Sequence, residues 1–215
     1  MKITEIFYSI SGESINAGYP TVFVRTYGCN CRCSYCDSDY SWSGGGYREL
    51  SISKILEEVN RYYPCDRVIL TGGEPLIQPD WKDLVKVLCD NGYTVEIETN
   101  GAVPLDRDIP NGVTYTMDWK SISSGMSDRM VEDNLHNLRP GDSIKFVVGS
   151  KEDLDQAKGI IEKILWTGVN IFFSPIFGKI EPKDIVQYIL DNKLVKCRMQ
   201  LQMHKFIWPP EQRGV

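Results

Sequence analysis

The sequence predicts an α/β fold in which one domain is built on a parallel sheet. Three observations lead to this prediction. The chain has 215 residues, a length that suits a single domain over residues 1–215. Segments with strand and helix periodicity alternate along the chain, which favours parallel strands joined by helical crossovers. The strands that alternate with helices number about six, too few for a closed eightfold barrel of ~250 residues.

The first two strand-like segments lead into polar residues. Residues 3–10 mix β-branched and aromatic side chains and end in a loop of small residues that carries one carboxylate, Glu13. Residues 21–26 predict a buried strand whose last inward position is Arg25. Because a buried charge is costly unless it meets an opposite charge, Arg25 is a candidate ligand for an anion.

Strands and helices then alternate through most of the chain. Helices are predicted to begin at Ser53, Asp80, Ser150 and Pro182, each followed by apolar residues at helical spacing. We expect the Ser150 helix to run through Leu165 to Gly168, and the Pro182 helix to be the last one. The intervening strands are predicted at residues 67–70, 94–98, 113–117, 144–148 and 171–173.

The C-terminal residues predict one more strand and a short tail. In residues 198–204 the apolar Met199, Leu201 and Met203 alternate with Gln200, Gln202 and His204. Two amides and an imidazole on one face of a strand favour a polar pocket over a dry core, where each group would need its own partner. The tail, residues 205–215, is too short to fold alone, and we expect it near the active site.

Composition excludes several classes of function. The net charge is −5, without the basic excess typical of proteins that bind the phosphate backbone of nucleic acids. No apolar run approaches the ~20 residues of a membrane span. The cysteine count is odd and no signal peptide is visible at the N-terminus, so we expect a cytoplasmic protein with reduced thiols.

Three cysteines on one short loop form the most specific motif. Cys29, Cys33 and Cys36 follow the spacing Cys-x3-Cys-x2-Cys. Three thiolates can hold three irons of a cubane cluster and leave the fourth iron open, whereas a closed electron-transfer cluster takes four cysteines. An open iron can bind a substrate or a cofactor. We expect Cys31 to lie beside the cluster without binding iron.

A structural zinc site is the alternative interpretation of these cysteines, since Cys-x2-Cys is its commonest half. A second close pair would then be expected downstream. Cys65, Cys89 and Cys197 instead stand alone and far apart.

A second motif, residues 71–75 (Thr-Gly-Gly-Glu-Pro), follows a predicted strand directly. Two glycines there let a ligand approach the backbone, and Glu74 stands at the strand end, where barrel folds place their sites. Glu98 ends the next strand, and we expect its side chain to point into the mouth of the site.

Both motifs resemble those of the radical S-adenosylmethionine superfamily, including Tyr35 and Asp37 beside the last cysteine. Within it, residues 7–13, 21–25, 29–38, 71–75, 98–101 and 202–205 resemble the 7-carboxy-7-deazaguanine synthase family. The resemblance implies a truncated (β/α)6-type, TIM-like barrel and a homodimer. It also implies a radical lyase that uses a 4Fe-4S cluster, S-adenosylmethionine and Mg²⁺, with flavodoxin or ferredoxin as reductant. The implied reaction converts 6-carboxy-5,6,7,8-tetrahydropterin to 7-carboxy-7-deazaguanine and ammonia, on the route to queuosine and related 7-deazapurines.

The resemblance also assigns roles to residues of this sequence. Cys29, Cys33 and Cys36 would ligate the cluster, and Ser38 would contact Mg²⁺. S-adenosylmethionine would be surrounded by Tyr35, Cys36, Asp37, Gly73, Glu74, Asp118, Trp119 and Lys120. Arg25 would bind the pterin carboxylate, and the ring system would be surrounded by Ile10, Ser11, Gly12, Glu13, Thr71, Glu98 and His204. The sequence departs from the family pattern at Ser11, at Ser38 and at residues 118–120.

Two other functions share the cysteine motif. One is a radical activase that installs a glycyl radical on a partner protein, but it has no use for Arg25 and residues 200–204 as ligands of a small molecule. The other is a non-catalytic zinc module, which has no use for residues 71–75.

Overall fold

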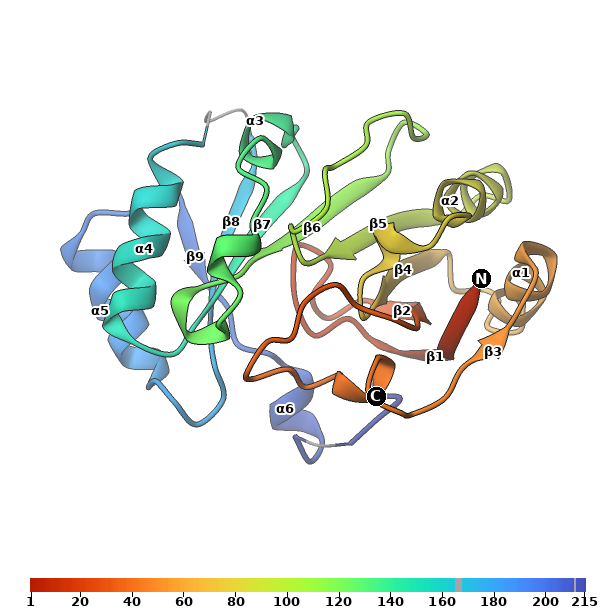
Figure 1. The fold of residues 1–215 in the computed structure, drawn as a ribbon, viewed down its shortest axis with the longest axis horizontal. Helices are drawn as coiled ribbons and strands as arrows, with labels where there is room; N and C mark the ends of the chain where they lie inside the picture. The colour runs from red at the N-terminus through yellow and green to blue at the C-terminus, as the bar shows by residue number, and fades with distance from the viewer. Residues whose placement is uncertain (165–167, 211) are drawn as a thin grey trace.

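The computed structural model describes residues 1–164, 168–210 and 212–215. Within these ranges, nine strands form one open sheet in the order β3-β1-β2-β4-β5-β6-β7-β8-β9. The strands follow an arc, with α1, α2, α4 and α5 outside it and α6 near its open side (Figure 1). The predicted α/β fold, a partial and TIM-like barrel, is confirmed.

Most of the sheet is parallel. The parallel strands are β2 (Pro20–Thr26), β4 (Arg67–Gly72), β5 (Thr94–Thr99), β6 (Thr114–Trp119), β7 (Ser143–Val148), β8 (Asn170–Pro175) and β9 (Cys197–Met199). At one edge, β1 (Lys2–Ile10) pairs antiparallel with both β2 and β3 (Arg48–Glu49). The prediction of a parallel sheet is wrong at this edge, because residues 11–19 are too few for a crossover and instead connect a hairpin.

The longer helices lie where the sequence places them. They are α1 (Ile52–Asn60), α2 (Trp81–Asp90), α4 (Lys151–Ile161) and α5 (Pro182–Asp191), while α3 (Asn134–Asn137) and α6 (His204–Ile207) are short. The hydroxyl of Ser51 caps α1 by accepting a hydrogen bond from the Lys54 backbone N–H at 3.2 Å, so this helix begins before the predicted Ser53. The Ser150 helix ends earlier than predicted, at Ile161, and the expected Leu165 lies outside the described residues.

The predicted strand over residues 198–204 is wrong beyond Met199. The chain leaves the sheet there, and α6 begins at His204, so the Pro182 helix is not the last. Gln200 turns towards the loop after β1: its Oε1 accepts from the Ser14 N–H at 2.7 Å and its Nε2 donates to the Ser14 carbonyl at 2.9 Å. Because these contacts replace the ladder of a strand, the segment crosses the open side of the arc.

The two faces of the parallel strands differ in chemistry. On the helix-covered face, residues such as Val24 and Leu70 pack with Leu84 and Leu88 of α2, all with no exposed surface. Burying each leucine in this way stabilises the fold by about 1.5–3 kcal/mol. The opposite face carries polar residues towards the strand ends, and register brings Asp118 of β6 beside Lys145 of β7. This face is therefore polar where a strand buried in a dry core would be apolar.

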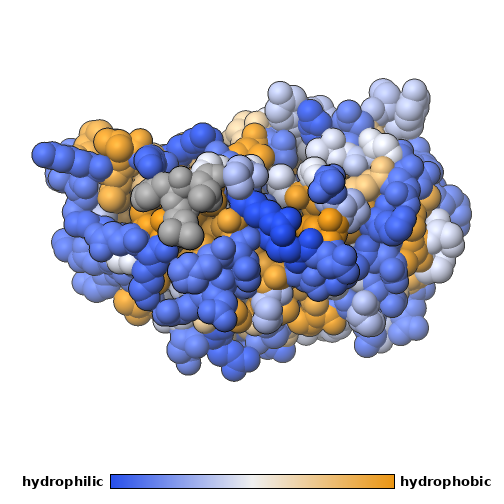
Figure 2. Space-filling view, turned by 90° about the horizontal axis from the view of Figure 1, so that it is seen from above, coloured by the Kyte–Doolittle hydropathy of each residue, from blue (hydrophilic) through white to orange (hydrophobic). Residues whose placement is uncertain are grey.

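The outer surface matches a globular protein. The face of the molecule in Figure 2 is mostly hydrophilic, with apolar side chains visible between polar ones. Within the described ranges, no helix is both long enough and apolar enough to cross a membrane.

Candidate active site

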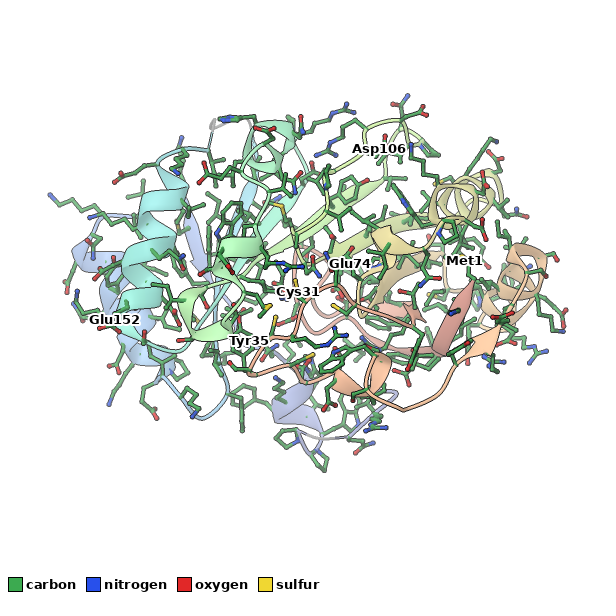
Figure 3. The ribbon with its side chains drawn as sticks, in the orientation of Figure 1. Met1, Cys31, Tyr35, Glu74, Asp106 and Glu152 are labelled. Atoms are coloured by element: carbon green, nitrogen blue, oxygen red, sulfur yellow. The ribbon has the colours of Figure 1, made fainter. Side chains whose placement is uncertain are left out.

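A cavity of about 560 Å³ opens at the carboxyl ends of the parallel strands. This is where open and closed α/β sheets place their ligands. Its walls come from the cysteine loop, the strand ends, the loop after β1 and the C-terminal residues. In Figure 3, Cys31, Tyr35 and Glu74 are labelled at the centre of the arc, far from Glu152 at the periphery.

The cysteine loop presents three thiols to this cavity. Cys29, Cys33 and Cys36 all line it and are partly exposed. The loop is held in place from outside, since Ser34 donates from its backbone N–H to the Ser124 carbonyl at 3.0 Å and from its hydroxyl to the Ser123 carbonyl at 2.6 Å. Burial raises the pKa of Cys29 and of Cys33 in the metal-free protein.

Cys31 differs from these three cysteines. Its side chain also borders the cavity, but only 2% of the residue is exposed. Burial, and then the neighbouring Cys29 and Cys33, raise the pKa of Cys31 to about 11. The thiols of Cys29, Cys33 and Cys36 are more exposed than this one and so are better placed to bind iron.

This donor set fits an iron-sulfur cluster with one open iron. Three free thiols border one cavity, which leaves room beside them for a further ligand. No three His, Cys, Asp or Glu side chains of the described residues are gathered around a single point, as one zinc ion would need. A cubane needs no such convergence, since each iron takes its own thiolate.

The glycines of residues 71–75 serve the packing of the cysteine loop. A Cβ on Gly73 would collide with the carbonyl oxygen of Gly28, and one on Gly72 would collide with Thr26. The backbone N–H of Glu74 donates to the Gly28 carbonyl at 2.8 Å. The close approach expected at these glycines is therefore made by the protein's own chain, although both glycines also line the cavity.

Glu74 is turned away from the cavity. Its carboxylate is fully buried and accepts hydrogen bonds from Leu76 N–H at 3.0 Å, Thr99 Oγ1 at 2.8 Å and Asn100 N–H at 2.7 Å. Burial raises the pKa of Glu74 to about 6, although these hydrogen bonds act to lower it. Glu74 thus joins the ends of β4 and β5, and Asn100, tethered here, donates from Nδ2 to Cys29 Sγ at 3.6 Å.

Arg25 lines the cavity from β2 and already has one partner. Its Nε lies 2.8 Å from Glu5 Oε1, which also accepts from the Tyr40 hydroxyl at 2.8 Å. The guanidinium lies over the Phe7 ring, 5.8 Å from the centroid. These contacts keep the guanidinium charged and restrict its orientation, and its side chain is still 17% exposed.

A network of paired charges forms the opposite wall. Lys145 Nζ lies 2.7 Å from Glu13 Oε2 and 3.2 Å from Asp118 Oδ1, and Lys120 Nζ lies 3.0 Å from Asp118 Oδ2. Burial acts against ionisation of Asp118, but Lys120 and Lys145 outweigh it and lower the pKa of that carboxyl. Glu98 lacks so close a cation. Burial raises its pKa to about 7, opposed by the more distant Lys145.

The C-terminal residues complete the cavity. The Met203 N–H donates to the Gly12 carbonyl at 3.1 Å, and His204 packs so closely on Gly12 that a Cβ there would collide with its ring. Lys205 Nζ pairs with Asp37 Oδ2 at 2.9 Å. Beyond α6, Arg213 stacks on Tyr40, with its guanidinium carbon 3.9 Å from the ring centroid. Described residues of the tail, from Pro210 to Val215, border the cavity.

The structure brings most of the predicted site residues to this one cavity. Those that line it are Ile10, Ser11, Gly12, Glu13, Arg25, Cys29, Cys33, Tyr35, Cys36, Asp37, Ser38, Thr71, Gly73, Glu98, Asp118, Lys120 and His204. Two do not line it: Glu74, for the reason above, and Trp119, which is 3% exposed and belongs to the core. Trp119 follows Asp118 on β6, so alternation sends its side chain to the other face of the sheet.

Sequence reasoning missed Lys145 and Lys205, which line the cavity, and Glu5, which pairs with Arg25. For Lys145 a signal existed, because it is the charged residue in a buried strand whose other residues, apart from Ser143, are apolar; a buried charge also identified Arg25. For Glu5 and Lys205 no local signal existed, because their partners Arg25 and Asp37 are distant in sequence.

Comparisons with known proteins show which family the chain resembles. The family model of the radical SAM superfamily matches residues 23–130. A 7-carboxy-7-deazaguanine synthase of Clostridium acetobutylicum is 40% identical over 100% of this chain and 99% of its own. One of Methanospirillum hungatei is 44% identical over 98% of this chain and 86% of its own.

Solved structures support the fold. The crystal structure of QueE from Escherichia coli superposes with a TM-score of 0.77 at 22% identity and covers 94% of both chains. SuiB from Streptococcus suis, in a structure bound to S-adenosylmethionine, superposes with a TM-score of 0.55 at 15% identity over 81% of this chain and 48% of its own.

Proposed function

Because the chain belongs to the 7-carboxy-7-deazaguanine synthase family of the radical SAM superfamily, we propose that it converts 6-carboxy-5,6,7,8-tetrahydropterin to 7-carboxy-7-deazaguanine and ammonia. One observation carries the proposal: a single cavity joins three free thiols to a wall of paired charges suited to a small polar substrate. The superfamily uses a 4Fe-4S cluster with S-adenosylmethionine, and when bound these supply the radical that removes hydrogen from the substrate.

The residues beside the thiols would hold the cofactor. Cys29, Cys33 and Cys36 would each bind one iron. Tyr35, Asp37, the backbone of Gly73, and the Asp118 and Lys120 pair would surround S-adenosylmethionine. Glu74 would act indirectly in this site, by fixing the strand ends to which Gly73 and Asn100 belong.

Residues of the other walls would hold the pterin. Arg25, oriented by Glu5, offers a charge-assisted hydrogen bond to the substrate carboxylate. Glu13 and Glu98 would accept hydrogen bonds from ring N–H groups, and His204, packed on Gly12, would close the site from the C-terminal side. Thr71 and residues 10–12 would complete the ring contacts.

Magnesium would bind near Ser38. The Ser38 hydroxyl makes no capping hydrogen bond to the short 3-10 turn that follows it, while the Ser38 carbonyl accepts from the Ser41 hydroxyl at 2.6 Å. The Ser38 hydroxyl lies 3.9 Å from Cys36 Sγ. Together with a substrate carboxylate it would supply part of the shell of Mg²⁺, which prefers oxygen ligands and keeps several waters.

The proposal includes an electron donor, flavodoxin or ferredoxin, and a homodimeric assembly, both implied by family membership. A cytoplasmic location stays a prediction from the unpaired thiols. The activase and zinc-module alternatives receive no support from the relatives.

An anaerobic assay of the reconstituted protein tests the function directly. With S-adenosylmethionine, a one-electron reductant and 6-carboxytetrahydropterin, we expect 7-carboxy-7-deazaguanine and ammonia in equal amounts. Binding of the carboxypterin without any conversion, or cluster-dependent modification of a protein partner instead, would contradict the proposal.

A further inference from the structure

Lys145 is a buried charge to which no role has yet been given. It lies on β7 between the buried Ile144 and Phe146, and only 5% of the residue is exposed. Burying an ammonium group costs several kcal/mol unless it is paired and hydrogen-bonded. Burial lowers the pKa of Lys145, but Asp118, Glu13 and Glu98 outweigh it and raise that pKa well above its ordinary value, so the side chain is cationic.

The two carboxylates that pair with Lys145 reach it from separate parts of the chain. Glu13 comes from the loop after β1, and its Oε2 lies 2.7 Å from Nζ. Asp118 comes from the end of β6, and its Oδ1 lies 3.2 Å from Nζ. Asp118 has a second cation in Lys120, at 3.0 Å. Lys145 is the one cation within 4 Å of Glu13 in the described part of the chain, so its removal would affect Glu13 most.

The pairing leaves one oxygen of Glu13 free. Among the described residues, Glu13 Oε1 is a buried atom without a hydrogen-bond partner, and Glu13 lines the cavity. A buried acceptor without a partner is costly, and a ligand that supplies a donor removes this cost. The pyrimidinone ring of a pterin carries adjacent amide and amino N–H groups, and an ionised carboxylate is the matching acceptor.

We propose that Lys145 is a positioning residue for the pterin: it fixes the Glu13 carboxylate through Oε2 and directs Oε1 at the ring N–H groups. The inference rests on the proposed function, and it adds a residue that acts through Glu13 without touching the substrate. Lys145 also contacts Asp118, which we place beside the cofactor. Asp118 has a second cation in Lys120, so it would stay paired without Lys145.

Binding measurements on the reconstituted protein, without reductant, test this role. Lys145→Met should weaken binding of 6-carboxytetrahydropterin about 10- to 100-fold, the range for losing a charged hydrogen-bond partner. Binding of S-adenosylmethionine should change less than about threefold, because Asp118 keeps Lys120. Lys145→Arg should restore most of the pterin affinity. Lys86→Met, at an exposed ion pair on α2, is the matched control and should change neither affinity.

A double-mutant cycle separates positioning from a merely structural role. If Lys145 acts through Glu13, Glu13→Gln should weaken pterin binding, and adding Lys145→Met to it should cause no further loss. Additive losses would overturn the inference, as would equal losses for the pterin and S-adenosylmethionine. If Lys145→Met does not fold, the double variant Glu13→Gln/Lys145→Met can still be compared with Glu13→Gln. The double variant has no Glu13 carboxylate left without its cation.

The two proposals fail in different ways. Equal pterin affinities of the wild type and Lys145→Met would overturn only the role of Lys145. Wild-type protein that does not bind the pterin at all would overturn the proposed function and this inference with it.

Discussion

The two halves of the cavity are built in different ways. The half that we propose for the cofactor, called the cofactor half, is mostly one continuous loop, residues 28–38, joined by Gly72, Gly73, Asp118 and Lys120. The substrate half gathers Glu13, Arg25, Glu98, Lys145 and His204 from separate elements. A continuous loop leaves a spacing pattern in the sequence, whereas a distributed wall depends on strand register, such as the pairing of Asp118 with Lys145. Local motifs therefore indicate the kind of cofactor, whereas the arrangement of the sheet determines which side chains line the rest of the cavity.

We expect the largest effect from substitutions of the three cysteines in the cofactor half. Cys29→Ala, Cys33→Ala or Cys36→Ala should each abolish the cluster and all turnover, because each removes the ligand of one iron. Cys31→Ala should keep the cluster. Iron content and visible absorbance after anaerobic reconstitution measure both outcomes. Loss of iron in Cys31→Ala as complete as in Cys33→Ala would show that the ligand set is different.

Arg25 tests whether the substrate half acts independently. Arg25→Ala should lower kcat/KM for the carboxypterin by about 10- to 100-fold or more, since a charged hydrogen bond to the substrate is lost. The cluster and slow cleavage of S-adenosylmethionine should remain. Arg25→Lys should rescue poorly, because an ammonium lacks the planar fork. Equal binding of a decarboxylated pterin by the wild type would remove the basis for this role.

Gly73→Ala should affect both the stability of the fold and the cluster. The new methyl group would collide with the Gly28 carbonyl, so we expect about 1–3 kcal/mol of destabilisation together with a lower cluster content. The control is Gly159→Ala in α4, where a Cβ meets nothing within 4 Å and alanine favours the helix. Thermal unfolding and iron content measure the pair; a Gly73→Ala protein as stable as wild type would contradict the packing argument.

Glu98 should make the stability of the folded protein depend on pH. Its pKa in the folded protein is raised from 4.5 to about 7, mainly by burial, so the folded state binds this proton more tightly than the unfolded state does. That contribution to stability is complete below about pH 4.5 and is lost as the pH rises through about 7. Glu98→Gln should therefore show a smaller fall in Tm than the wild type between about pH 5 and about pH 8, a range that brackets the raised pKa. Parallel Tm profiles would contradict the raised pKa.

Ser38 should give the smallest effect. Ser38→Ala should raise the magnesium concentration needed for half-maximal rate by about two- to fivefold, since one neutral oxygen ligand among several waters is removed. The cluster spectrum should stay the same. An unchanged magnesium requirement would show that Ser38 is only a turn residue, and Asp39 would become the next candidate ligand.

The sequence alone predicted the α/β class, the order of the main elements and the motif of the cofactor half. These features are local: periodicity, caps such as Ser150, and cysteine spacing are all set within a few residues. The same reasoning failed where long-range contacts override local pattern. Residues 200–203 alternate as a strand would, yet hydrogen bonds to Ser14 and Gly12 draw them across the cavity.

Only the tertiary structure decided which polar residues face one another. Glu74 stands within the most recognisable part of its motif, yet it is buried between strand ends, while Lys145, without any motif, lies among the carboxylates of the cavity. The physical reason is that each buried charge must find its partner in space. Partners such as Glu13 and Lys145 become neighbours only when the hairpin loop and the parallel strands come together.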